Sequence, residues 1–297
     1  MQHATGRLSW APFPLLALGL LSGGASLAAE PGSGSGEYNL FNPTPARLMR
    51  DFNTDRPSIT EGPFTVDPGH LQTESDFVNF TQSKPDPDGT VTTTNQYSGT
   101  NFRLGVTSDL ELNFILQPYT TVRTRMVDPT SKTWMAGIDT AQLRAKYNFF
   151  GNDTYKNPGA TAFAVIPFVN IPTTHNGISQ DHVDGGLIFP FALKLTDKAD
   201  LSAMTEFDYV KNEMTSGYHV EYVNTGGVSY QLTDKLGTYV EIATRFGNES
   251  PFGGIVMAGG GFTYKLADNL QVDIVMNVGL TRASDRVNVL TGISKRY

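Results

Sequence analysis

Apolar and polar side chains alternate most clearly in the stretch Leu110-Glu111-Leu112-Asn113-Phe114-Ile115-Leu116. Successive side chains of a β-strand point to opposite faces, so this period of two predicts a strand with one apolar and one polar face. Continued to residue 126, the strand has an apolar face made of Leu110, Leu112, Phe114, Leu116 and Val122. Its polar face is then made of Glu111, Asn113, Gln117, Tyr119, Arg123 and Arg125.

The same alternation recurs along the chain in segments bounded by Gly, Pro, Asn or Asp. Twelve strands are predicted, at 70–82, 95–107, 110–126, 138–150, 160–172, 183–196, 200–212, 218–232, 236–248, 254–266, 270–283 and 288–297. Tight connections at 108–109, 197–199, 234–235 and 268–269 alternate with longer polar ones at 84–94, 127–137, 173–182, 212–217 and 248–253. Only the connection at 151–159 departs from this order. Such an alternation is typical of an outer-membrane barrel, whose tight turns face the periplasm.

Strand length separates two architectures that both alternate, the soluble β-sandwich and the membrane barrel. Strands of soluble proteins are commonly about 5–6 residues long, whereas a tilted strand that spans a bilayer needs about 9–11. Nearly all of the predicted strands reach the longer length. We therefore predict an all-β fold, a transmembrane antiparallel up-and-down β-barrel of about 12 strands.

The composition of the 297-residue chain excludes several classes of protein. The chain has no Cys, which rules out a disulfide framework, a Cys-ligated metal site and a thiol nucleophile. Its 22 Lys and Arg residues against 29 Asp and Glu residues form no basic stripe. Nucleic acid is therefore not a predicted partner.

Residues 1–29 have the order of a secretory signal peptide. Arg7 supplies the basic region, residues 11–21 the apolar region and residues 23–29 a small-residue cleavage zone. The apolar run is shorter than the about 20 residues that a spanning helix needs. We predict Sec-type export, cleavage near Ala28 or Ala29, and location in the outer membrane of a Gram-negative cell.

Residues 30–69 are rich in Pro, Gly and Ser and show no sustained period. We predict a linker followed by an irregular segment here, and the barrel domain at 70–297. The segment contains Asp55, Arg56 and Glu61, which need partners if they are buried. Two placements remain open for this segment, a plug inside the barrel and a periplasmic cap.

The polar faces of the predicted strands carry both signs of charge. Alternation places the following residues along a solute pathway in the lumen: Arg103, Glu111, Arg123, Arg125, Arg144, Lys146, Glu206, Asp208, Glu221, Glu241, Arg245 and Asp273. These residues either filter a polar or amphipathic solute, or pair across strands and fill a narrow barrel. Four of them form a basic group that needs acidic partners or an anionic ligand: Arg123, Arg125, Arg144 and Lys146. We predict that Glu61 or Asp55 pairs with a member of this basic group.

The histidines give little support for catalysis. After the signal peptide they are His70, His175, His182 and His219, and no HExxH, GxSxG or Gly-rich phosphate loop accompanies them. A weak divalent-metal site at His175 and His182 is one explanation for their shared loop, and polar loop composition is another. We predict no cofactor and no metal site, and we do not expect an enzyme.

Residues 51–74 resemble the opening of a family of bacterial outer-membrane transporters, the MetA-pathway of phenol degradation family. The resemblance rests on an Asp-Arg-Pro, a Thr-Glu-x-Pro and a Thr-Val-x-Pro-Gly motif. Its matching residues include Asp55, Arg56, Pro57, Thr60, Glu61, Pro63, Pro68 and Gly69. The chain end, Leu290 to Tyr297, is similar to the family's closing strand. The resemblance implies an outer-membrane barrel that passes small, aromatic or apolar compounds.

Two functions of different classes remain open. The first is an outer-membrane channel that passes such compounds into the periplasm. The alternative is a plugged structural or interaction barrel whose outer loops bind a partner. The predicted partners are outer-membrane lipid, an unidentified small solute, and the barrel-assembly machinery, which would engage the C-terminal strand ending in Tyr297.

Overall fold

The computed structural model of the chain describes residues 37–125, 132–175, 177–212, 215–247 and 253–297. The predicted signal peptide lies outside these residues. The described part contains a 3-10 helix, η1 (Ala46–Leu48), and fifteen β-strands. The strands are β1 (Leu71–Gln82), β2 (Val91–Tyr97), β3 (Thr100–Gly105), β4 (Leu110–Leu116), β5 (Tyr119–Arg125), β6 (Lys132–Gly137), β7 (Ala141–Phe150), β8 (Thr161–Ile171), β9 (Asp184–Lys194), β10 (Ala199–Lys211), β11 (Tyr218–Gln231), β12 (Leu236–Phe246), β13 (Ile255–Ala267), β14 (Leu270–Gly279) and β15 (Val287–Arg296). No helix in these residues is long and apolar enough to cross a membrane.

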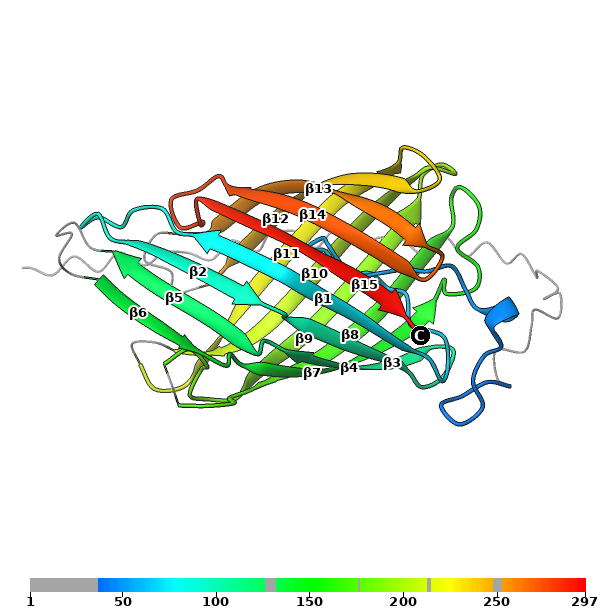
Figure 1. Cartoon of the computed structure of the whole chain (residues 1–297), viewed down its shortest axis with the longest axis horizontal. Coiled ribbons are helices and arrows are strands. Elements are labelled where there is room, and N and C mark those ends of the chain that lie inside the picture. Colours follow the sequence, from blue (N-terminus) through cyan, green and yellow to red (C-terminus); the bar gives the residue numbers. More distant parts are fainter. Residues whose placement is uncertain (1–36, 126–131, 176, 213–214, 248–252) are drawn as a thin grey trace, which may run out of the picture. The chain divides into compact units, whose positions relative to one another are not determined.

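The strands form one antiparallel sheet that closes into a barrel, because β15 pairs with β1 (Figure 1). Three pairs, β2 with β3, β4 with β5 and β6 with β7, each make up one interrupted strand of the wall. The wall therefore has the twelve strands predicted from the sequence, and the predicted fold class is confirmed. The amide of Tyr297 donates to the carbonyl of Leu71 at 2.8 Å, so the barrel begins and ends at the same rim.

Two of the predicted loops are shorter than expected. The prediction of loops over 84–94 and 127–137 is wrong at their C-terminal ends, because β2 begins at Val91 and β6 spans Lys132–Gly137. The start of β2 is rich in β-branched side chains, which favour strands. β6 gains its backbone partners from β5.

Four neighbouring strands are interrupted at one level of the wall. β1 has a register shift between Asp76 and Val78, and the other interruptions fall at 98–99, 117–118 and 138–140. Hydrogen bonds join them side by side: the amide of Asp76 donates to the carbonyl of Gly99, and the amide of Asp139 to that of Gln117. An inserted residue in a strand reverses the faces of every side chain beyond it.

A chain of amide side chains identifies the inner face beyond the interruptions. The Nδ2 of Asn277 donates to Asn288, the Nδ2 of Asn288 to Asn79, and the Nδ2 of Asn79 to Gln96. Gln96 is in turn the ladder partner of Thr120, and directly opposed residues of antiparallel strands share a face. Even-numbered residues of β5 therefore point inward. In β4, by contrast, the odd-numbered residues point inward.

This reversal corrects four predicted orientations. Val122 points inward, and Tyr119, Arg123 and Arg125 point outward, so their predicted faces are wrong. Pro118, just before β5, has no amide hydrogen to donate to the ladder, and the strand breaks there.

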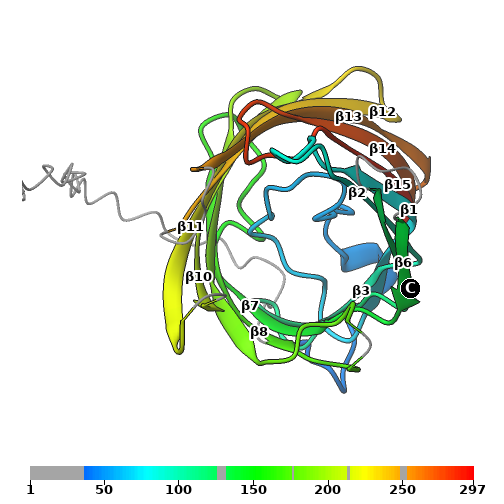
Figure 2. The same ribbon diagram turned by 90° about the vertical axis from the view of Figure 1, so that its left-hand side faces the viewer.

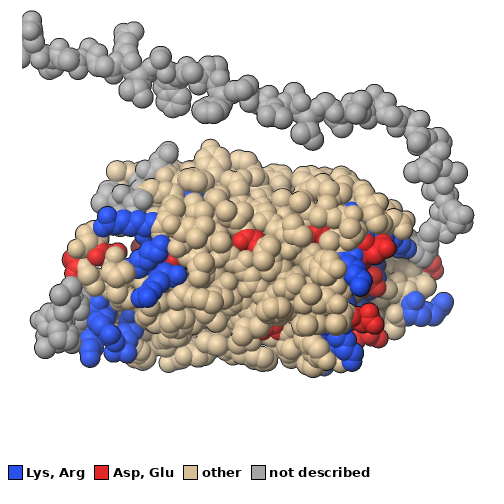
Figure 3. Space-filling model, turned by 90° about the horizontal axis from the view of Figure 1, so that it is seen from above, with Lys and Arg blue, Asp and Glu red and all other residues tan. Residues whose placement is uncertain are grey.

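Elsewhere the outer wall is apolar and most of the inner wall is polar. Val240 and Ile274 on the outside are 66% and 54% exposed, whereas Glu111 on the inside is fully buried. Charged side chains gather toward the two ends of the barrel in Figure 3 and are sparse in the broad band between them. An apolar outer wall around a polar interior is the arrangement of a transmembrane barrel.

Part of the blue N-terminal trace, residues 50–67, runs inside the ring of strands, whereas η1 lies beyond the end of the barrel in Figure 1. Figure 2 looks along the barrel and shows this part, in blue, crossing the interior. We call residues 50–67 the inner segment; the structure assigns no helix or strand to it.

Candidate functional site

The inner segment binds the lumen wall through its own backbone. The amides of Ile59 and Thr60 donate to the Glu241 carboxylate at 2.9 and 3.1 Å. The amide of Val66 donates to Glu111 at 2.7 Å. Since prolines keep the segment out of a regular ladder, these carboxylates supply acceptors that a neighbouring strand would otherwise provide.

Asp55 lies at the centre of a buried charge cluster. Its carboxylate is 2.7 Å from the Nζ of Lys146 and 3.1 Å from Arg103. Arg103 also pairs with Glu74 at 2.6 Å and Glu111 at 2.9 Å. Burial alone would raise the pKa of Asp55, but Arg103 and Lys146 outweigh it and hold that pKa below its ordinary value. The carboxylate is therefore charged and fixed in place at neutral pH.

Two more ion-pair groups hold the inner segment to the seam between β14, β15 and β1. Arg56 pairs with Asp273 at 2.7 Å and with Asp76. Asp67 pairs with Arg296 at 3.0 Å, and also with Arg50 at 3.0 Å. Ion pairs thus fix the inner segment at both of its ends and in its middle.

The predicted pairing between the irregular segment and the basic group is confirmed for two of its four members. Glu61 pairs with Arg144, and Asp55 pairs with Lys146. Arg123 and Arg125 take no part, because they lie on the outer wall. The prediction that these two belong to the lumen is wrong for the reason given above.

The other ten predicted lumen residues point inward. Arg103, Glu111, Arg144, Lys146, Glu241 and Asp273 contact the inner segment. Four lie nearer the long-loop rim: Glu206, Asp208, Glu221 and Arg245. There Arg245 pairs with Asp208 at 2.6 Å and with Glu221 at 3.4 Å. Their part in a solute pathway stays a prediction.

The remaining motif residues shape the path of the inner segment. The Pro57 carbonyl accepts from the Tyr239 hydroxyl, and the Pro63 carbonyl accepts from Asn148. Thr60 donates its hydroxyl to Glu241 at 3.0 Å. After the segment, the Pro68 carbonyl accepts from Thr44. Gly69 has a φ of +76°, which favours glycine, and its Cβ position would lie 2.7 Å from Pro43.

A cavity of about 560 Å³ remains beside the inner segment at the tight-turn rim. The segment forms one wall of this cavity, and β9 to β13 form the other. Its lining includes Tyr155, Lys198, Tyr239, Glu241 and Thr263. The inner segment makes most of its contacts with charged side chains on β1, β3, β4, β7, β14 and β15. The cavity therefore lies on the side of the lumen where the segment makes the fewest such contacts.

On the long-loop side of the cavity, the lumen contains an apolar cluster that the sequence analysis did not predict. It consists of Ile166, Ile188, Met204 and Val223, with Phe168 packed against them. The amide of Glu61 lies 3.3 Å from the Sδ of Met204, so the inner segment covers one edge of the cluster. A signal was present: residues 162–168 read Ala-Phe-Ala-Val-Ile-Pro-Phe, which is apolar on both faces.

The described residues of the histidine loop form no metal-binding cluster. The ring nitrogens of His182 lie 2.9 Å from the Asp181 carboxylate and 3.5 Å from the Asp184 carboxylate. These distances are those of ordinary polar contacts between side chains. Among the residues that the structure describes, no group of three His, Asp or Glu side chains is placed to hold a metal ion.

Comparison with known proteins gives one sequence match. A family model for the MetA-pathway of phenol degradation matches residues 54–297, which includes most of the inner segment. No curated protein matches the chain in sequence.

Three solved structures resemble the barrel at low identity. The NanC porin has 9% identity and a TM-score of 0.46, and the match covers 76% of this chain and 98% of that one. The CymD monoaromatic hydrocarbon channel has 11% identity and a TM-score of 0.40, with 76% and 87% covered. The translocator domain of the autotransporter NalP from Neisseria meningitidis has 9% identity and a TM-score of 0.45, with 77% and 88% covered.

Proposed function

We propose that this chain, which belongs to the MetA-pathway of phenol degradation family, is an outer-membrane channel that passes small apolar or aromatic compounds into the periplasm. The observation that carries the proposal is the apolar cluster of Ile166, Ile188, Met204, Val223 and Phe168 in an otherwise charged lumen. The name of the family supports an aromatic solute.

Chemistry favours a small apolar solute over an ion. The cluster side chains are buried against one another, so a solute that water solvates poorly would pass by replacing their mutual contacts with its own. The cavity below the cluster has about 560 Å³, within the range of about 300–1,000 Å³ typical of sites for small molecules. A solute would then contact the apolar cluster first and the cavity next, on one path toward the periplasmic rim.

The outer-membrane location rests on the wall of the barrel and on the N-terminal sequence. The outer wall is apolar around the ring, as lipid requires. The predicted signal peptide would direct export, and an even number of strands would return both barrel ends to the periplasmic side.

Uptake by intact Gram-negative cells tests the proposal. We expect cells that make the chain to take up a labelled monoaromatic compound faster than cells without it. Met204→Gln keeps the length of the side chain but makes the cluster polar, so uptake should fall. Met204→Leu is the matched control, because it keeps the cluster apolar at a similar side-chain volume and should preserve uptake. An equal rate in cells with and without the chain would contradict the proposal.

The inner segment favours a second candidate, a closed barrel with a structural or binding role. The ion pairs of Asp55, Arg56 and Glu61 hold the segment across the lumen. Deleting residues 53–66 separates the two candidates in a planar bilayer. A channel should conduct before the deletion and several-fold more after it, whereas a closed barrel should conduct only after it.

A further inference from the structure

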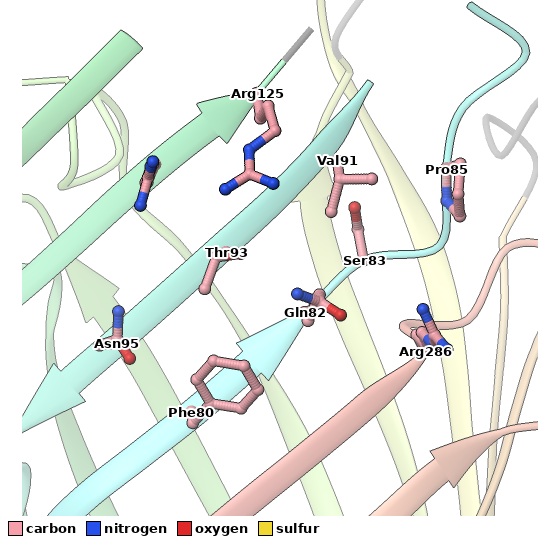
Figure 4. Close-up of a pocket in the computed structure, with 10 residues that line it drawn as sticks. Phe80, Gln82, Ser83, Pro85, Val91, Thr93, Asn95, Arg125 and Arg286 are labelled. Carbon is pink, nitrogen blue, oxygen red and sulfur yellow. The ribbon is translucent and has the colours of Figure 1, made fainter. Parts of the chain in front are cut away.

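The outer wall carries a basic groove near the long-loop rim. It has a volume of about 350 Å³ and lies over β1, β2 and β5 and the start of the 83–90 loop. Its lining includes Phe80, Gln82, Thr93, Arg123, Arg125 and Arg286. In Figure 4, Gln82, Ser83 and Val91 lie between Arg125 and Arg286.

Among the residues that the structure describes, the three arginines of the groove have no acidic partner. None of Arg123, Arg125 and Arg286 makes an ion pair or a side-chain hydrogen bond with any residue that the structure describes. No Asp or Glu of the described part of the chain lines the groove. In the lumen, by contrast, Arg103 and Arg144 are paired with carboxylates. Three exposed guanidinium groups around one hollow therefore leave a site of unbalanced positive charge.

The groove lies just beyond the apolar band of the wall. Along the outer face of the second and third wall strands, the ladder pairs change from Phe102 with Phe114 to Tyr97 with Tyr119. Four residues beyond Tyr119, about 13 Å along the strand, comes Arg123. Tyrosine marks the boundary between hydrocarbon and headgroups in membrane barrels. The guanidinium groups therefore lie at the level of the headgroups.

Neighbouring side chains fit the same level. On β6, Trp134 is the ladder partner of Arg123, and Lys132 is the partner of Arg125. Trp134 is 65% exposed on the outer wall, as interfacial tryptophans are. Lys132 adds a fourth positive charge beside the groove.

The strand interruptions create this groove. Without the inserted residue near Pro118, Arg123 and Arg125 would point into the lumen like Glu111. The insertion turns both arginines to the outer wall.

We infer that this groove binds the phosphate groups of a phosphorylated glycolipid of the outer leaflet, the lipid A part of lipopolysaccharide. Arginine forms paired hydrogen bonds to phosphate oxygens, and the three guanidinium groups surround a space for such a headgroup. Phe80 and Val91 provide apolar contacts for the first part of an acyl chain. The inference rests on the proposed outer-membrane location but not on the proposed solute.

Binding of lipid A to the purified full-length barrel in detergent tests the inference. The probes are bisphosphorylated lipid A and the same lipid after removal of both phosphates. We expect the phosphorylated form to bind and the triple variant Arg123→Gln/Arg125→Gln/Arg286→Gln to lose at least about tenfold in affinity, since one charged hydrogen bond is worth about this much. Because these side chains lie on the surface, the variant should still fold, and its heat-modifiable migration on a gel checks this.

A matched variant controls for overall charge. Lys156→Gln/Lys235→Gln/Lys295→Gln removes three positive charges from the tight-turn rim and should bind lipid A like the wild type. Three results would overturn the inference: an equal loss in this control, equal binding of the lipid without phosphates, or unchanged affinity in the arginine variant. A failure of lipid binding would leave the uptake result of the proposed function unaffected, so the two can fail separately.

Discussion

The two sides of the barrel wall, β1 to β7 and β8 to β13, enclose the lumen in different ways. The first side is interrupted at one level and holds the inner segment through buried pairs, such as Asp55 with Lys146. The strands of the second side run through that level without a break, and β13 has one register shift between Lys265 and Ala267. This side bears the apolar cluster and the wall of the cavity. The difference indicates that the first side fixes the inner segment by ion pairs, whereas the second side leaves room for a solute.

The largest expected effect concerns the ion pairs of the first side. Arg103→Met should lower the free energy of unfolding by about 3–5 kcal/mol, because it leaves buried carboxylates without their partner. Arg103 is 1% exposed and pairs with Asp55, Glu74 and Glu111. Urea unfolding in lipid vesicles measures the change.

Arg245→Met provides the counterpart on the second side. The Arg245 side chain is 45% exposed, so its loss should cost less than about 1 kcal/mol. Equal costs for the two variants would remove the distinction between the sides of the lumen.

Lipid contact gives the next effect, on the strands adjoining the cavity. Ile274→Arg should destabilise the barrel by about 2–4 kcal/mol, because Ile274 lies outward near the centre of β14. Thr263→Arg should cost less, since Thr263 lines the cavity and an arginine there can extend into it. The same unfolding assay compares them, and a larger cost at Thr263 would contradict the assigned faces.

The reversal of faces on the first side gives a smaller effect. Leu112→Asn, before the interruption, should cost about 1–3 kcal/mol, because it places an amide in lipid. Val122→Asn, beyond the interruption, should cost less than about 1 kcal/mol, since Val122 points inward. If Val122→Asn is as harmful as Leu112→Asn, the strand continues through Pro118 without a reversal.

The smallest expected effect is a loosening of the inner segment by acid. The pKa of Asp55 is lowered from 3.8 in the folded state, so its contribution to holding the segment is complete above about pH 4 and is lost as the pH falls through the lower folded value. Cleavage of the segment by pepsin should therefore rise below about pH 4 in the wild type. Asp55→Asn should be cleaved above pH 4 as readily as below it. A wild type already cleaved above pH 4 would contradict the prediction.

Alternation predicted the barrel but could not follow its interruptions. Period two is a local signal, and it fixed the faces of Glu111 and Ile274 because their strands are continuous around them. It failed at Arg123, because one inserted residue reverses all that follows. Pro118 was the visible sign of that insertion.

Charge logic predicted part of the site in a similar way. The need of Glu61 and Asp55 for cationic partners indicated Arg144 and Lys146. The pairing of Arg56 with Asp273 joins residues 217 positions apart, which no local pattern encodes. The apolar cluster was missed because the prediction assigned every lumen face to polar side chains.

The seam between β1 and β15 sets the order in which this protein can assemble. Its hydrogen bond from Asn288 to Asn79 joins residues 209 positions apart, and Arg296 reaches back to Asp67 in the inner segment. Closing so long a loop is entropically costly and slow, and it needs the last strand of the chain. Because Arg296 lies on the last strand, its ion pair with Asp67 of the inner segment can form only once β15 is in place. A chain that lacks β15 would therefore leave an open sheet with two unpaired edges.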